Sequence, residues 1–171
     1  MTAGIMIAFE LACRASAGRV KFILPDELSG TLSSRQVKHR QWHQWRTTLD
    51  GKRQNLVPDG AFILEYAGEA EGKNRRLCFV EADRGTMPLR RSRGTASCIQ
   101  RKLRLYTQLW KSGQFSKMSG VNRIQVWIVT GNAGRMANMK QAFANLPAGK
   151  GLFHFTEMGA LPALANTLVG L

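Results

Sequence analysis

Two short apolar runs that carry acidic side chains at one end constrain the fold of this chain most strongly. Residues 56–64 read LVPDGAFIL, with Asp59 near the start, and residues 77–83 read LCFVEAD, with Glu81 and Asp83 at the end. Both runs are rich in the β-branched and aromatic residues that favour strands. A carboxylate at the end of a buried strand is costly unless a positive group meets it. The two runs therefore predict neighbouring strands whose acidic ends share a cation.

The three carboxylates favour a metal site. Glu81 and Asp83 are two residues apart, so their side chains face the same side of an extended strand. Mg²⁺, or Mn²⁺ in its place, relieves the repulsion between such groups, because it is a hard cation that binds carboxylate, water and phosphate oxygens. Each acid alone also fits a structural role: Asp59 in a Pro-Asp-Gly turn, and the other two in ion pairs with Arg84 or Arg90. Together they predict a metal site formed by Asp59, Glu81 and Asp83.

The charge of the chain predicts an anionic partner. Lysine and arginine number 25 against 11 aspartates and glutamates, which gives a net charge of +14 and a pI near 10.7. Such an excess is typical of proteins that bind nucleic acid, and less often of proteins that bind anionic membranes; an aid to solubility is the alternative. The apolar segment 4–12 is too short to span a membrane. Three cysteines without a C-x-x-C spacing exclude a disulfide framework and a zinc site, and they fit a cytoplasmic protein.

The order of helical and strand patterns predicts a single domain over residues 1–171 of the α/β (α+β) class, with a central mixed β-sheet flanked by helices. Expected helices cover residues 5–14, 33–49, 95–110 and 133–146, followed by a small closing helix. Expected strands cover residues 19–24, 55–66, 76–81, 124–130 and 152–155. Asp50-Gly51 is a turn signal.

Lys102 is the next candidate for the site. It lies beside the apolar stripe of its predicted helix, next to Leu103 and one turn before Tyr106. This position allows its ammonium to reach the end of the sheet, where it would hold a phosphate or help to activate a water molecule. A solvated helix lysine is the alternative. Tyr106 is expected to be half core residue and half polar tip.

Basic residues gather in two segments, and both are candidates for DNA binding. In residues 35–46 they interleave with Trp42 and Trp45, whose rings either stack on unpaired bases or anchor the core. Gly131 to Arg135 opens a helix, so it either holds a phosphate at the helix N-terminus or forms a plain turn. The candidate DNA-binding residues are Lys38, Arg40, Arg46, Arg84, Arg90, Arg91, Arg93 and Arg101.

The Pro-Asp of residues 58–59, the FVEADRGT of residues 79–86 and the KLRLY of residues 102–106 resemble the PD-(D/E)XK nuclease superfamily, and more narrowly the replication-relaxation family of plasmid and mobile-element proteins. The resemblance implies a restriction-endonuclease-like fold in α-β-β-β-α-β order. It also implies that Asp59 and Glu81 bind Mg²⁺ and that Lys102 assists catalysis. Glu10 would be the additional helix carboxylate of some members; its alternative is an ion pair with Arg14.

The chain departs from the superfamily pattern at Asp83, because the motif places a lysine two residues after the acid. Either Lys102 supplies that cation from the helix, or the site only binds DNA. The first expectation is a metal-dependent DNA endonuclease that cuts or nicks the DNA of a plasmid or other mobile element. The alternative is a catalytically inactive nuclease-fold module for DNA binding or assembly.

Longer members of the family carry a winged-helix region before this domain, whereas this chain starts almost directly at the nuclease-like part. DNA recognition is therefore expected to come from its own surface or from a partner. Expected partners are DNA and other proteins of a mobile-element nucleoprotein complex, with a homodimer as an open alternative.

Overall fold

A five-stranded mixed sheet lies at the centre of the computed structural model, which describes residues 1–30, 44–89, 98–145 and 151–170. Its strands lie side by side in the order β1 (Val20–Ile23), β4 (Gly60–Tyr66), β5 (Arg75–Asp83), β6 (Arg123–Thr130) and β7 (Phe153–Glu157). β4 runs antiparallel to β1 and to β5, whereas β6 runs parallel to β5 and to β7. The parallel pairs need long crossover connections, and helices provide them. This architecture confirms the predicted α+β fold with a mixed sheet between helices.

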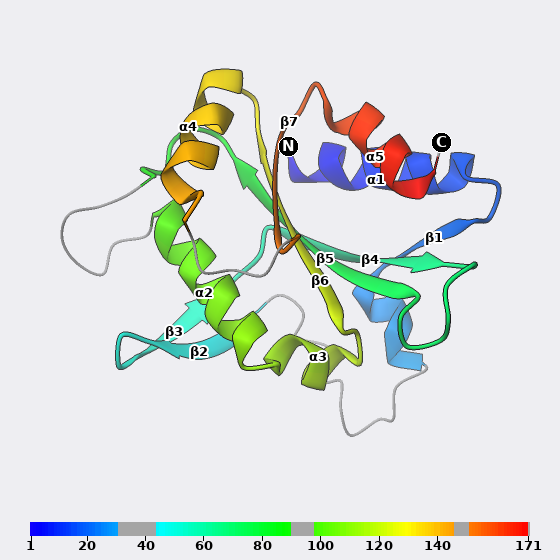
Figure 1. Cartoon of the computed structure of the whole chain (residues 1–171), viewed down its shortest axis with the longest axis horizontal. Helices are drawn as coiled ribbons and strands as arrows, with labels where there is room; N and C mark the ends of the chain where they lie inside the picture. The colour runs from blue at the N-terminus through cyan, green and yellow to red at the C-terminus, as the bar shows by residue number, and fades with distance from the viewer. Residues whose placement is uncertain (31–43, 90–97, 146–150, 171) are drawn as a thin grey trace.

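Helices cover both faces of the sheet (Figure 1). One face carries α1 (Thr2–Ala15) and α5 (Leu161–Val169); the other carries α2 (Ile99–Lys111), α3 (Gln114–Ser119) and α4 (Ala133–Phe143). Side chains alternate between the two faces along each strand. On β5, for example, Phe79 packs into the core beneath α2, whereas Val80 packs into the core beneath α1. The protein therefore has one hydrophobic core on each face of the sheet.

The end of β5 lies where acidic groups from two strands meet. β4 begins at Gly60 opposite Val80, so Asp59 precedes the strand at the level of Glu81. β5 and β6 are covered on both faces, which explains their nearly continuous apolar sequences. Their parallel register pairs Glu81 with Ile128 and Asp83 with Thr130. The carboxyl ends of these two strands and the start of β4 therefore share one edge of the sheet.

The prediction of a helix up to residue 49 is wrong. Residues 45–49 form β2 (Trp45–Leu49), which pairs with β3 (Lys52–Leu56) in a two-stranded hairpin. Both turn residues have positive φ, +52° at Asp50 and +73° at Gly51, as the tight turn of a hairpin requires. Alternating burial along β2 and its β-branched threonines favour a strand over a helix. The earlier part of the predicted helix, residues 31–43, lies outside the described residues.

The predicted strand over residues 55–66 is interrupted. It consists of the end of β3 and the whole of β4, separated by Val57, Pro58 and Asp59. Proline lacks an amide hydrogen and leaves the ladder, which explains the break. The other predicted elements are confirmed within a few residues at each end. η1 (Pro25–Gly30), a short 3-10 helix, and α3 are additions that the periodicity did not predict. Within the described residues, every helix is too short or too polar to cross a membrane.

Candidate functional site

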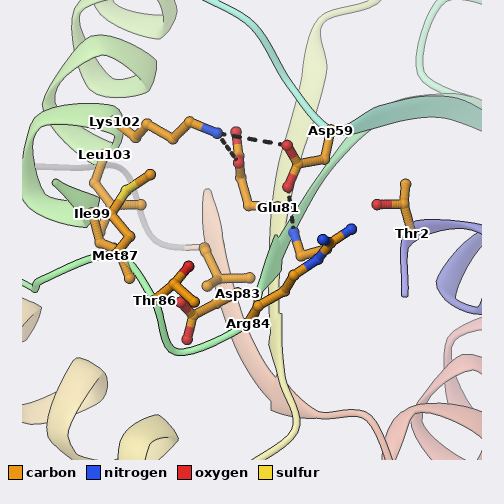
Figure 2. Close-up of a pocket in the computed structure, with 12 residues that line it drawn as sticks. Thr2, Asp59, Glu81, Asp83, Arg84, Thr86, Met87, Ile99, Lys102 and Leu103 are labelled. Atoms are coloured by element: carbon orange, nitrogen blue, oxygen red, sulfur yellow. Dashed lines mark hydrogen bonds and ion pairs between the residues drawn. The ribbon is translucent and has the colours of Figure 1, made fainter. Parts of the chain in front are cut away.

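Asp59 is fixed to β5 by two backbone contacts. Its amide donates a hydrogen bond of 3.0 Å to the carbonyl of Val80, and its Oδ2 accepts one of 2.8 Å from the amide of Ala82. Figure 2 shows the Asp59 carboxylate above the end of β5, facing Glu81. The break at Pro58 allows this arrangement, because the chain leaves β3 and turns before β4 begins. The predicted juxtaposition of Asp59 with Glu81 is therefore present.

Glu81 is buried in β5 and each of its carboxylate oxygens has a partner. Oε1 accepts a hydrogen bond of 2.7 Å from the hydroxyl of Tyr106, and Oε2 accepts one from Nζ of Lys102. The pKa of Glu81 is raised to about 7: burial is the largest cause and the negative charge of Asp59 adds to it, while the ammonium of Lys102 and the two hydrogen bonds act in the opposite direction. A second cation at this position would favour the ionised form.

Lys102 and Tyr106 reach the site from one face of α2, four residues apart. The helix buries Ile99 and Leu103 against the sheet, and this packing directs Lys102 toward the strand ends. Nζ of Lys102 lies 3.8 Å from Oδ1 of Asp59 and also contacts Glu81, so one ammonium bridges both carboxylates. Tyr106 is fully buried, with its ring in the core and its hydroxyl, the predicted polar tip, on Glu81; burial together with Glu81 raises its pKa well above the usual value. It therefore remains protonated and donates to Glu81.

A cavity of about 320 Å³ opens beside these side chains. Asp59, Glu81 and Lys102 line one part of it, and Thr2 and Arg84 line another. Apolar side chains of α2 and β6 close its wall. Figure 2 shows Lys102 reaching toward Asp59 and Glu81, and Arg84 extending from the end of β5 toward Thr2. Asp83 also lines the cavity, which is thus bordered by three carboxylates and two cations.

Asp83 is bound by a residue of α4 and, within the described residues, does not share a partner with Asp59 and Glu81. Its Oδ2 and Oδ1 accept hydrogen bonds of 2.5 and 2.9 Å from the guanidinium of Arg135, and Oδ1 also accepts one of 3.2 Å from the amide of Gly85. Arg135 also donates to the carbonyl of Met87 at 2.5 Å. The described part of the chain holds no group of three acidic, histidine or cysteine side chains placed to bind one metal. The predicted cluster of three carboxylates is therefore reduced to Asp59 and Glu81.

Glu10 is absent from the lining of the cavity. It forms an ion pair of 2.6 Å with Arg14, one turn along α1. The helix does reach the site, but through Thr2 at its first turn. The ion pair with Arg14, the alternative to a role of Glu10 in the site, is therefore the one observed.

The candidate DNA-binding residues fall into three groups. Arg84 is exposed and lines the cavity, whereas Arg101 contacts Gln54 of β3 and Arg46 lies exposed on β2. The remaining five, Lys38, Arg40, Arg90, Arg91 and Arg93, lie outside the described residues. Trp45 is only 1% exposed and packs edge to face against Phe79 and Phe115, with ring centroids 5.7 and 4.6 Å away. It is a core anchor and offers no surface to a base.

Arg135 is the site residue that sequence reasoning missed. The segment from Gly131 to Arg135 forms the turn between β6 and α4, where Oδ1 of Asn132 accepts a hydrogen bond of 2.9 Å from the amide of Arg135. The one available signal was its place in the first turn of a helix that follows a buried strand. A basic side chain there opposes the helix dipole, so a nearby carboxylate is expected.

Comparison with known families gives one match. Residues 10–124 match the replication-relaxation family, and this range covers more than half of the chain. It includes Asp59, Glu81, Lys102 and Tyr106, whereas Arg135 follows it. Comparisons with curated proteins and with solved structures gave no match. The chain therefore belongs to the replication-relaxation family.

Proposed function

We propose that this protein is a metal-dependent DNA endonuclease that cuts or nicks the DNA of a plasmid or other mobile element. The observation that carries the proposal is the bridge made by Lys102 between Asp59 and Glu81 at the mouth of a cavity. Two carboxylates at the ends of neighbouring strands can hold a metal ion, and one ammonium from a helix can hold the phosphate, as metal-dependent phosphodiester hydrolysis requires. Membership of the replication-relaxation family supports a role in plasmid replication or relaxation.

The order of elements supports a PD-(D/E)XK-like fold. α1, β1, β4, β5, α2 and β6 follow one another as α-β-β-β-α-β, with η1 and the hairpin of β2 and β3 inserted after the first strand and the short α3 inserted before β6. The four strands are neighbours in the sheet, and the last pair is parallel. This is the order that the sequence resemblance implies. Because a fold does not determine chemistry, the proposal rests on the site rather than on the topology.

The two carboxylates fit a divalent cation. Both lie within ion-pair reach of the single Nζ of Lys102, so they are close enough to share one cation. Mg²⁺ commonly uses one or two carboxylates and completes its coordination with waters and phosphate oxygens. Asp59 and Glu81 would hold the ion, which would polarise the scissile phosphate and lower the pKa of a bound water. Asp83 is excluded from this set because Arg135 engages both of its oxygens.

The side chains of the protein prepare the site for an anionic substrate. Hydrolysis joins a water oxygen to phosphorus and breaks one phosphate ester bond, and negative charge builds up on the phosphate oxygens. The ammonium of Lys102 borders the cavity and would donate a hydrogen bond to such an oxygen. Tyr106 donates to Glu81 and does not line the cavity, so it acts as a positioning residue that holds Oε1 in place. Arg84, exposed at the rim, would bind a neighbouring phosphate.

A second candidate function is a DNA-binding module without cleavage. The observation that favours it is Asp83, which stands where the superfamily motif has lysine and is neutralised by Arg135. In this case the contact between Lys102 and Glu81 would be purely structural. The two candidates make opposite predictions for cleavage and the same prediction for salt-sensitive DNA binding. Cleavage therefore decides between them.

The test incubates the protein with supercoiled plasmid and with linear single- and double-stranded DNA, in Mg²⁺, in Mn²⁺ and in EDTA. Asp59→Asn removes a carboxylate of the site, and Asp50→Asn is its matched control, because Asp50 pairs with Arg104 on the surface. The proposal expects cleavage that requires the metal, survives in Asp50→Asn and is lost in Asp59→Asn. Tight binding without cleavage in every metal would favour the second candidate. Cleavage that persists in Asp59→Asn would place the active site elsewhere.

A further inference from the structure

A second cavity adjoins the candidate active site. It has a volume of about 720 Å³ and lies between the carboxyl ends of β5 and β6 and the first two turns of α4. Asp83 and Arg84 line both cavities, so the two adjoin at the end of β5. The remaining lining combines the polar side chains of Thr130, Asn132, Arg135 and Asn138 and three glycines with the apolar side chains of Met1 and Leu89.

Thr130 is a nearly fully buried polar residue at the base of this cavity. It is 1% exposed and lines the cavity, and in the described part of the chain its hydroxyl has no hydrogen-bond partner. Side chains alternate along β6, so Thr130 points to the same face as Ile128, which packs beneath α2. This is the face from which α4 covers the sheet, and it directs the hydroxyl toward the cavity. The hydroxyl is therefore available to donate a hydrogen bond to a ligand in the cavity.

The first turn of α4 adds donors to the same cavity. Oδ1 of Asn132 accepts from the amide of Arg135, and the carbonyl of Asn132 accepts from the amide of Met136. The amides of Ala133 and Gly134, of which Gly134 lines the cavity, have no acceptor within the described residues, as is usual for the start of a helix. These amides and the helix dipole favour an anion. The helix has 11 residues, so its dipole is fully developed.

The charges around the cavity also favour an anion. Arg84 is exposed and lies at the junction of the two cavities. The carboxylate of Asp83 would repel an anion, but Arg135 binds both of its oxygens, and the amide of Gly85 binds one of them. The pair is therefore neutral, and among the side chains of this lining Arg84 is left as the unbalanced charge.

We infer that this second cavity binds a backbone phosphate of the DNA strand whose scissile phosphate lies at Asp59, Glu81 and Lys102. The donors are the Thr130 hydroxyl and the first amides of α4. The side chain of Asn138 provides a further polar group at the wall, and Arg84 lies between the two phosphates. The two cavities adjoin, which favours a strand that passes both over a free nucleotide. The inference rests on the proposed function for the identity of the strand, and on the second cavity alone for the binding of phosphate.

The test measures binding of a fluorescein-labelled oligothymidylate in EDTA, where no cleavage occurs, over a series of salt concentrations. Thr130→Val removes the hydroxyl and keeps the shape, and Asn138→Asp places a negative charge at the wall from an exposed helix position. Each is expected to weaken binding about tenfold, since a hydrogen bond to a charged group is worth about that much. Asn138→Asp should also make the slope of log affinity against log salt less steep by about 0.7, which is the value for one phosphate contact on a single strand.

Two matched variants keep the result interpretable. Thr156→Val removes the hydroxyl of another buried threonine, on β7, and Ala137→Asp adds the same charge to the neighbouring exposed position of α4. Neither residue lines the cavity, and both variants should bind as the unaltered protein does. Equal affinity and equal salt slope in all five proteins would overturn the inference. Competition by thymidine monophosphate as strong as that by the oligonucleotide would overturn its assignment to a strand.

The outcome is separable from that of the proposed function. The binding assay contains no divalent cation, so its result does not depend on whether the protein cuts DNA. Absence of cleavage together with the expected effects of Thr130→Val and Asn138→Asp would contradict the endonuclease and leave the phosphate site in place. Metal-dependent cleavage with unaltered binding in both variants would do the reverse.

Discussion

The hydroxyl of Tyr106 and the ammonium of Lys102 divide the two carboxylate oxygens of Glu81 between them. Tyr106 donates to Oε1 at 2.7 Å, and Lys102, one turn earlier on α2, donates to Oε2. Since Lys102 also reaches Asp59, Oε2 is the oxygen that takes part in the bridge between the two acids. One face of a single helix therefore sets both the orientation of Glu81 and the charge beside it.

Tyr106→Phe is expected to destabilise the protein and to weaken its use of metal. The change leaves Oε1 of Glu81 buried without its donor, which costs about 1–3 kcal/mol of unfolding free energy. A freely turning carboxylate should also raise the Mg²⁺ concentration needed for half-maximal plasmid nicking. Urea denaturation and a Mg²⁺ titration measure the two effects. The control is Tyr66→Phe, which removes a hydroxyl at the end of β4 away from the site, where it accepts from Arg76 at 3.1 Å and donates to the carbonyl of Leu168 at 3.4 Å. Equal Mg²⁺ requirements in both variants would refute a positioning role.

Arg135→Ala is expected to be among the most destabilising changes of a charged residue in the protein. Asp83 is buried, and without Arg135 its carboxylate loses both side-chain hydrogen bonds. Breaking one side of a buried pair typically costs about 3–5 kcal/mol. The comparison is Arg104→Ala, which breaks the exposed pair with Asp50 and should cost about 1 kcal/mol or less. Similar losses in the two variants, measured by urea denaturation, would show that the buried pair is not an anchor of the site.

Trp45→Ala is expected to unfold the hairpin side of the core rather than to remove a DNA contact. The indole is buried against Phe79 and Phe115, and truncation of a buried tryptophan costs about 3–5 kcal/mol. Trp45→Phe, which keeps an aromatic ring in the core, should retain DNA affinity. An oligonucleotide-binding measurement checks this. A large loss of affinity in a stably folded Trp45→Phe protein would restore base stacking as its role.

His154 is expected to make the protein less stable below neutral pH. Its ring stacks on Trp127 with centroids 4.2 Å apart, and burial lowers its pKa below the ordinary value of about 6.5. The unfolded chain then takes up a proton at a higher pH than the folded protein, so the contribution of His154 to stability is lost as the pH falls through that value. In His154→Phe this part of the pH dependence should vanish. Urea denaturation of both proteins on either side of that pH measures the difference; identical pH dependence would contradict the expectation.

The local sequence was sufficient for the groups that lie on regular elements. Asp59, Glu81 and Lys102 were predicted from two apolar runs with acidic ends and from the stripe of one amphipathic helix, and the structure brings the three together. The mixed sheet followed from the order of periodic segments. These features depend on spacing along the chain, which the sequence displays directly.

Long-range pairing explains what the sequence did not reveal. Arg135 and Asp83 lie 52 residues apart, and their contact depends on how α4 crosses the end of β5. The periodicity of residues 45–49 predicts the end of a helix, whereas the structure has a hairpin whose register pairs Trp45 with Leu56 and buries both. Packing against the sheet decided that segment, because short apolar segments fit either period.

The most direct test of the account compares initial rates of supercoiled-plasmid nicking in Mg²⁺ for the unaltered protein, Glu81→Gln and Glu65→Gln. Glu65 is the matched control: it is a partly buried glutamate on β4, bound to Arg75 at 2.5 Å, at the opposite end of that strand from Asp59. The account predicts metal-dependent nicking by the unaltered protein and by Glu65→Gln, and a loss of about 100-fold or more in Glu81→Gln, since even groups that merely support a metal ligand cost 10- to about 100-fold. Equal rates in Glu81→Gln and Glu65→Gln would contradict it.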